Sequence, residues 1–139
     1  MSYLSLRQKV ELLAAPATEQ VEWLDQSFSL VTGGGSAEGY GNDELLDGYF
    51  EDVVALNHLV EIGQVTKTEA ESMLRLEDFI AEMSKGNDEF FERDALFSDR
   101  RWEDIRVVAK EVLAELPNKS NDPEWMKKFF GGKSEKPIA

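Results

Sequence analysis

The chain has 139 residues and a formal net charge of −13, with 28 Asp and Glu against 15 Lys and Arg. Such a charge opposes binding to nucleic acids and anionic membranes, and it favours cationic partners. The sequence contains no cysteine, which excludes disulfides, thiolate zinc sites and thiol nucleophiles. Because 42% of the residues are hydrophobic, the chain can bury a core, and its length suits one domain.

The first third of the chain predicts two helices followed by a loop. Leu6, Val10 and Leu13 recur at helical spacing before Ala15 and Pro16, where we expect the first helix to end. Thr18 is the expected cap of a second helix, although residues 28–31 also alternate like a short strand. Residues 32–42 contain five glycines, which a helix does not tolerate, so we expect a loop.

The middle of the chain predicts two further helices with defined ends. Residues 43–62 carry apolar side chains on one helical face, and Gly63 is the expected stop. Thr66 and Glu69 have the spacing of a capping box, which predicts the start of the next helix. Gly86 is expected to end that helix.

The remaining residues predict an acidic turn and two more helices. We expect residues 87–94 to form one helical turn, and Ser98 or Asp99 to cap a helix that ends before Pro117. A last short helix starts at residues 122–123. The prediction is an all-α irregular bundle of five or six helices, with a single domain at residues 1–130 and a flexible tail at 131–139. Its core includes Leu46, Phe50, Val53, Ile80, Ile105, Val108 and Val112.

The negative charge is concentrated in the middle of the chain. Residues 38–104 alone carry a formal charge of −13, and the other segments cancel one another. Carboxylates that face solvent, with aromatic side chains between them, are typical of interfaces that attract and anchor a basic protein. The residues predicted to contact the partner are Glu44, Asp47, Glu51, Asp88, Glu89, Glu92, Tyr40 and Phe91.

One group of residues resembles a metal or acid–base cluster. Asp47, Glu51 and His58 fall on one face of the helix predicted at residues 43–62. Residues seven apart are separated by roughly 10 Å along a helix, whereas the ligands of one metal ion lie near 2 Å from it. We therefore expect no metal, no cofactor and no enzymatic activity. A metal-dependent hydrolase that uses this face is the alternative, which a metal-binding assay would test.

Two stretches, residues 43–58 and 98–113, resemble small acidic bacterial proteins, the immunity proteins of polymorphic toxin systems. In that family an aspartate-arginine-tryptophan turn opens the last amphipathic helix, and Asp99, Arg101 and Trp102 match this turn. The resemblance covers about residues 43–116 and transfers no binding residue. It implies that the chain binds and neutralises a cognate bacterial toxin, which is expected to be basic.

A second hypothesis belongs to a different class of protein. The chain would then be a helical adaptor or regulatory module that binds a basic protein segment, with no toxin involved. A gene position directly downstream of a toxin gene would separate the two hypotheses. The sequence shows neither a secretory signal nor a run of 18 apolar residues, so we expect a cytoplasmic protein that does not bind membranes or nucleic acid.

Overall fold

The computed structural model describes residues 2–29, 41–86 and 89–131, and these residues are almost entirely helical. Within them there are eight α-helices and no strand, which confirms the all-α prediction. The predicted number of five or six helices is wrong. The helices are α1 (Tyr3–Ala14), α2 (Ala17–Ser29), α3 (Asp43–Val53), α4 (Leu56–Glu61), α5 (Lys67–Met83), α6 (Ala95–Ser98), α7 (Arg100–Ala114) and α8 (Pro123–Met126).

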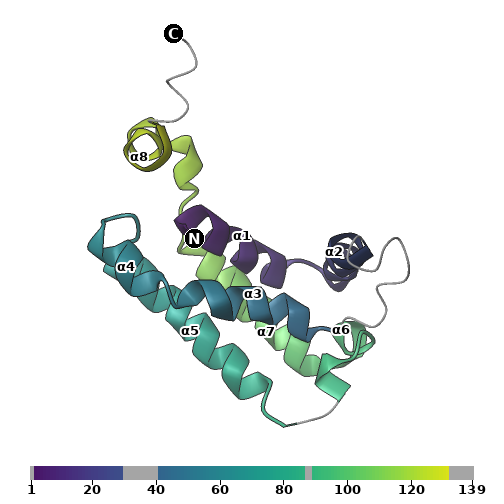
Figure 1. The fold of residues 1–139 in the computed structure, drawn as a ribbon. Helices are drawn as coiled ribbons and strands as arrows, with labels where there is room; N and C mark the ends of the chain where they lie inside the picture. Colours follow the sequence, from purple (N-terminus) through teal and green to yellow (C-terminus); the bar gives the residue numbers. More distant parts are fainter. Residues whose placement is uncertain (1, 30–40, 87–88, 132–139) are drawn as a thin grey trace.

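Four of the longer helices form the body of the molecule. Helix α1 packs on α7 and α3, and α5 also packs on α7 and α3, so that these four helices enclose a common core (Figure 1). Helix α2 lies at one end of this body and contacts α1, α3 and α6. Helix α8 lies at the opposite end, beyond the start of α1 (Figure 1).

The signals that start and stop helices in the sequence act mostly as predicted. The Thr66 hydroxyl accepts a hydrogen bond from the Glu69 N–H (3.1 Å), and Glu69 Oε1 accepts one from the Thr66 N–H (2.9 Å). Gly63 and Gly86 adopt φ values of +80° and +98°, which favour glycine after a helix. Asp99, not Ser98, caps α7. The prediction of a Thr18 cap is wrong, because α2 begins at Ala17. Of the residues 28–31, for which helix and strand were both open, Phe28 and Ser29 are helical, and residues 30–31 lie outside the described residues.

The helix predicted at residues 43–62 is divided into α3 and α4. The Ala55 N–H donates to the Asp52 carbonyl (3.0 Å), three residues back, which tightens the chain at Val54 and Ala55. The β-branched pair Val53 and Val54 lowers the helix propensity at this point. Leu56 and Leu59 are buried. This division and the one-turn helix α6 together account for the excess over the predicted number.

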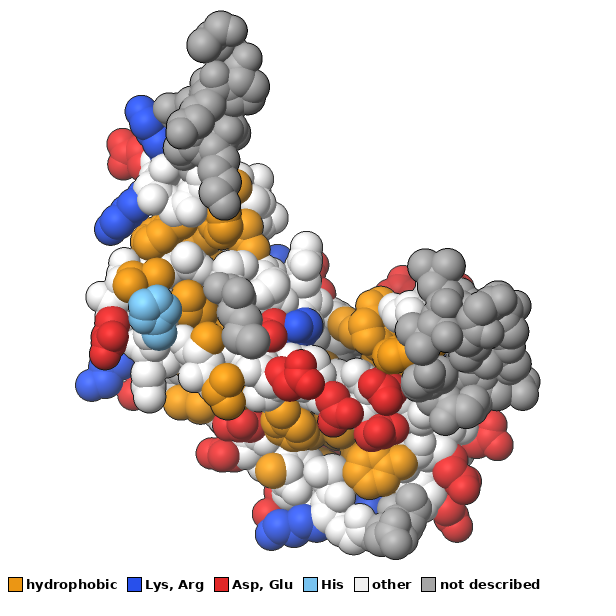
Figure 2. All heavy atoms as spheres, viewed as in Figure 1, with side chains coloured by type: hydrophobic (Ala, Val, Ile, Leu, Met, Phe, Trp, Pro, Cys, Tyr) orange, Lys and Arg blue, Asp and Glu red, His pale blue; other side chains and the backbone are white. Residues whose placement is uncertain are grey.

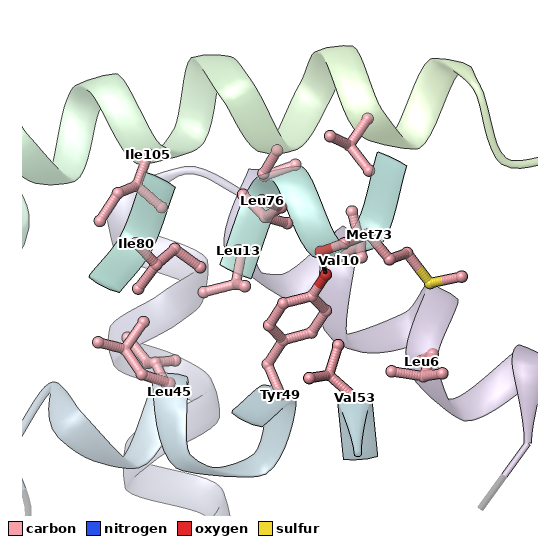
Figure 3. Packing of buried hydrophobic residues seen from close by; sticks show 14 of the residues in the cluster. Leu6, Val10, Leu13, Leu45, Tyr49, Val53, Met73, Leu76, Ile80 and Ile105 are labelled. Atoms are coloured by element: carbon pink, nitrogen blue, oxygen red, sulfur yellow. Dashed lines mark hydrogen bonds between the residues drawn. The ribbon is translucent and has the colours of Figure 1, made fainter. Parts of the chain in front are cut away.

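The core is a single cluster in which residues of α1, α3, α5 and α7 meet (Figure 3). Of the predicted core residues, Leu46, Val53, Ile80, Ile105 and Val112 are buried. Phe50 and Val108 are only half-buried against this cluster, which corrects the prediction for both. The buried aromatic side chain of α3 is Tyr49, whose ring points between α3 and α5 (Figure 3).

The C-terminal part of the described chain is a short helical arm. Asp122 caps α8, and its Oδ1 accepts hydrogen bonds from the N–H groups of Glu124 and Trp125. The Trp125 ring meets the Tyr3 ring edge to face, with centroids 6.0 Å apart. A π-helical turn at Lys127–Gly131 follows, so Gly131 belongs to the helical arm and not to the predicted tail. Residues 132–139, the rest of that tail, lie outside the described residues.

None of the helices in the described ranges combines the length and the apolar character that crossing a membrane requires.

Candidate functional site

The outer face of α3 carries a row of carboxylates. The apolar side chains of α3, among them Leu45, Leu46 and Tyr49, point to the core. Asp47 and Glu51 lie on the opposite side and are exposed, while Glu44 is half-buried. Figure 2 shows acidic side chains gathered over the part of the surface where α3 lies, with hydrophobic side chains beside them. The predicted orientation of the three carboxylates toward solvent is therefore confirmed for Asp47 and Glu51 and holds in part for Glu44.

The carboxylates of this row repel one another. Carboxylate oxygens of Asp43, Glu44 and Asp47 lie within 4.8 Å of one another. Partial burial raises the pKa of Glu44, and the charges of Asp43, Asp47 and Glu51 raise it further. The pKa of Asp47 is also raised, by partial burial and then by Asp43 and Glu51. A cation held against this row would relieve the repulsion.

His58 does not join this row. It is an exposed residue of α4, beyond the turn at Val54 and Ala55. In the described ranges the group of acidic or histidine side chains close enough to share an ion is Asp43, Glu44 and Asp47, and it includes neither Glu51 nor His58. The structure therefore does not assemble the cluster of Asp47, Glu51 and His58 that the alternative hypothesis of a hydrolase requires.

The second acidic segment follows α5 and is joined to α3 by Asn42. The Asn42 side chain is 0% exposed, and its Nδ2 donates to the carbonyls of Phe90 (3.2 Å) and Glu92. The Asn42 N–H donates to the Phe91 carbonyl (3.0 Å). These three hydrogen bonds fix the start of α3 directly on the turn Glu89–Phe91, so the two predicted acidic segments become neighbours in space.

Beside this junction lies a polar hollow of about 600 Å³. Glu89 and Glu92 are exposed and line it together with Asp94 and Asp99. The Asp99 carboxylate accepts hydrogen bonds from Arg101, and these bonds lower the pKa of Asp99. We use the name acidic surface for the α3 row together with the rim of this hollow, that is, Glu44, Asp47, Glu51, Glu89 and Glu92.

Phe91, one of the predicted contacts, belongs to a group of aromatic side chains that pack on one another. Phe91 is half-buried and packs edge to face on the buried Phe90 ring, with centroids 5.0 Å apart. Phe90 in turn stacks on Trp102, whose Nε1 donates to the Phe90 carbonyl (2.8 Å). Phe91 is thus partly exposed and also supports the turn, and its contact with a partner stays a prediction. Tyr40 and Asp88, two other predicted contacts, lie outside the described residues.

Three residues that the sequence did not single out belong to this region. Val54 is 76% exposed and Phe97 is 62% exposed, more than the other exposed large hydrophobic side chains among the described residues. Val54 follows Asp47 and Glu51 at helical spacing, and this spacing could have placed it on the acidic face. Phe97 lies between the hollow-lining residues Ala95 and Ser98. No pattern in the sequence indicates the role of Asn42, because the carbonyls that its side chain binds lie about 50 residues away in the sequence.

Comparison of the chain with protein-family models, with curated proteins and with solved structures gave no match.

Proposed function

We propose that the chain is an immunity protein of the bacterial cytoplasm that binds a basic toxin domain through the acidic surface and thereby neutralises it. The observation that supports the proposal is the junction at Asn42, which brings two acidic segments about 40 residues apart in the sequence next to each other. The proposed function requires no metal ion and no catalytic group from this chain.

The electrostatics of the α3 row support binding of a cation. The pKa values of Glu44 and Asp47 are raised first by partial burial and then by repulsion from neighbouring carboxylates, so their charges are destabilised in the free protein. A lysine or arginine of a partner would remove this repulsion on binding. The charge of the whole surface would also accelerate encounter with a basic partner, an effect that salt weakens.

Val54 and Phe97 supply the apolar contacts that a charged surface alone lacks. Interfaces derive much of their binding energy from a few apolar or aromatic anchors, while the surrounding charges provide orientation and specificity. Val54 follows Glu51 at helical spacing, and Phe97 directly precedes the hollow-lining residue Ser98 in the sequence, so both exposed side chains are available as such anchors in this proposal.

Charge reversal tests the proposal with the toxin encoded beside the gene for this chain. The variant Asp47→Lys/Glu51→Lys should weaken toxin binding at least tenfold, which corresponds to about 1.4 kcal/mol. Cells that co-express toxin and variant should lose protection. The matched control is Glu71→Lys/Asp78→Lys, which makes the same charge change at exposed positions of α5. This control should keep both affinity and protection.

Stopped-flow measurements of the native pair add a kinetic test. Raising the salt concentration should slow association more than it accelerates dissociation. Full protection by Asp47→Lys/Glu51→Lys, with unchanged affinity, would contradict the proposal. Binding of a basic protein segment without any protection from the toxin would instead favour the adaptor hypothesis.

A further inference from the structure

Helices α1 and α2 form a groove on a part of the molecule that the acidic surface does not include. The groove has a volume of about 370 Å³ and is lined by eight residues, four from each of its two sides. Both sets repeat at i, i+3, i+4 and i+7, the spacing that places side chains on one face of a helix. The lining residues are Gln8, Glu11, Leu12 and Ala15 on the first side and Glu19, Glu22, Trp23 and Gln26 on the second.

The position of α2 against α1 is fixed by a buried side chain. Gln20 is 0% exposed, and its Nε2 donates to the carbonyls of Leu12 (3.1 Å) and Leu13 (3.3 Å) at the end of α1. Its Oε1 accepts a hydrogen bond from Arg106 Nε of α7 (3.1 Å). These bonds cap the last carbonyls of α1 and hold both walls of the groove, so the groove is preformed.

The groove combines an apolar floor with acidic walls. Leu12, Ala15 and Trp23 are half-buried, and the Trp23 ring meets Phe28 edge to face with centroids 6.1 Å apart. Glu19 and Glu22 are exposed on the same stripe of α2 as Trp23. Neither lysine nor arginine is among the lining residues. Glu11 is paired with Arg7 (3.5 Å), so Glu19 and Glu22 carry the charge available to a partner.

The molecule already contains one cation bound by the same combination of groups. Lys119 Nζ lies 4.0 Å from the centroid of the Tyr3 ring and 2.6 Å from the Glu69 carboxylate, and it donates to the Gln64 carbonyl. An aromatic face, a carboxylate and an oxygen acceptor thus satisfy an ammonium group here. The described residues that line the groove offer an aromatic ring and carboxylates to such a group.

We propose that the α1–α2 groove binds an arginine side chain of a partner protein segment. The aliphatic part of the arginine would lie on Leu12 and the Trp23 ring, and its guanidinium would pair with Glu19 and Glu22. Arginine fits better than lysine, because its planar head stacks on an indole and pairs with two carboxylate oxygens at once. Apolar residues beside the arginine would cover Ala15. This site is separate from the acidic surface and does not depend on the function proposed above.

A blocked pentapeptide with a central arginine between leucines serves as the probe. Binding is followed through the indole Nε1–H signal of Trp23 in ¹H–¹⁵N NMR spectra, assigned by its loss in Trp23→Phe. We expect a saturable shift of this signal. The same peptide with citrulline, a neutral analogue of arginine, should bind at least fivefold more weakly, because it keeps the shape and loses the charge.

Two variants with the same change in charge locate the site. Glu19→Gln/Glu22→Gln should weaken binding of the arginine peptide about tenfold, whereas Asp47→Asn/Glu51→Gln should leave it unchanged. An equal loss in both variants would show attraction by net charge only and would overturn the proposal. Absence of a Trp23 shift, or equal binding of the citrulline peptide, would also overturn it. None of these outcomes bears on toxin binding at the acidic surface.

Discussion

Neighbouring aromatic side chains on α3 have different roles. Tyr49 is fully buried, and its hydroxyl donates to the Met73 carbonyl of α5 (2.5 Å), as Figure 3 shows. Phe50 is half-buried at the edge of the same cluster. Successive residues of a helix are rotated by about 100°, so Tyr49 and Phe50 point in different directions, and Tyr49 is the one that points to the centre of the core.

Truncation of Tyr49 should therefore destabilise the protein far more than truncation of Phe50. We expect Tyr49→Ala to lower the free energy of unfolding by about 3–5 kcal/mol, because it leaves a cavity in the core. Phe50→Ala should cost less than half as much. Tyr49→Phe should cost about 1 kcal/mol, which is the usual contribution of a hydrogen bond. Urea denaturation followed by circular dichroism measures all three, and an equal cost for Tyr49→Ala and Phe50→Ala would contradict this assignment.

The start of α3 depends on close contact between two backbone segments. A Cβ atom at Gly41 would lie 2.6 Å from the Phe91 carbonyl oxygen, which belongs to the backbone and accepts the hydrogen bond from Asn42. A Cβ atom at Gly48, in the middle of α3, would lie 3.3 Å from Cε of Lys9. The Lys9 side chain can move, whereas the backbone at Phe91 cannot move without loss of the junction.

Alanine substitutions at these two glycines should have opposite effects on stability. Gly41→Ala should lower the free energy of unfolding by about 1–3 kcal/mol, as overpacking does. Gly48→Ala should raise it by about 0.5–1 kcal/mol, because alanine favours a helix interior more than glycine does. Thermal unfolding of both variants tests this. Hydrogen exchange at the Asn42 amide provides a second readout, which should accelerate only in Gly41→Ala.

Local signals in the sequence made most of the helices predictable. Contacts between residues that are distant in the sequence could not be predicted. The capping box at Thr66, the glycine stops and the Asp99 cap act within a few residues, so the sequence alone indicates them. Asp47 and Glu51 were placed correctly because helical spacing fixes the outer face of α3. The Asn42 junction and the groove between α1 and α2 depend on which helices meet. No short stretch of sequence specifies this.

The whole molecule carries a large excess of negative charge, and its effect on stability varies with pH. The pKa values of Glu44 and Asp47 are raised by partial burial and by neighbouring carboxylates, and that of Glu77 by partial burial and Asp78. A carboxyl group whose pKa is higher in the folded than in the unfolded chain destabilises the fold while it is charged. The pKa of Asp99 is shifted in the opposite direction, because its hydrogen bonds to Arg101 hold this pKa below the usual value of 3.8. The charged Asp99 therefore stabilises the fold.

The free energy of unfolding should therefore rise on mild acidification and fall in strong acid. As the pH falls toward the usual pKa values of 4.5 for glutamate and 3.8 for aspartate, Glu44, Asp47 and Glu77 take up protons in the folded state first, which relieves their repulsion. Below the unfolded-state pKa of Asp99, near 3.8, the contribution of the Asp99–Arg101 pair is progressively lost. Urea denaturation between about pH 3.5 and 7 at low salt should show a maximum of the free energy of unfolding on the acidic side of neutrality.

In Asp47→Asn the free energy of unfolding at pH 7 should be higher and its rise toward this maximum smaller, since one of the repelling charges is gone. A stability that falls steadily from pH 7 downward in the native chain, or an unchanged profile in Asp47→Asn, would show that repulsion along α3 does not limit the stability of the fold.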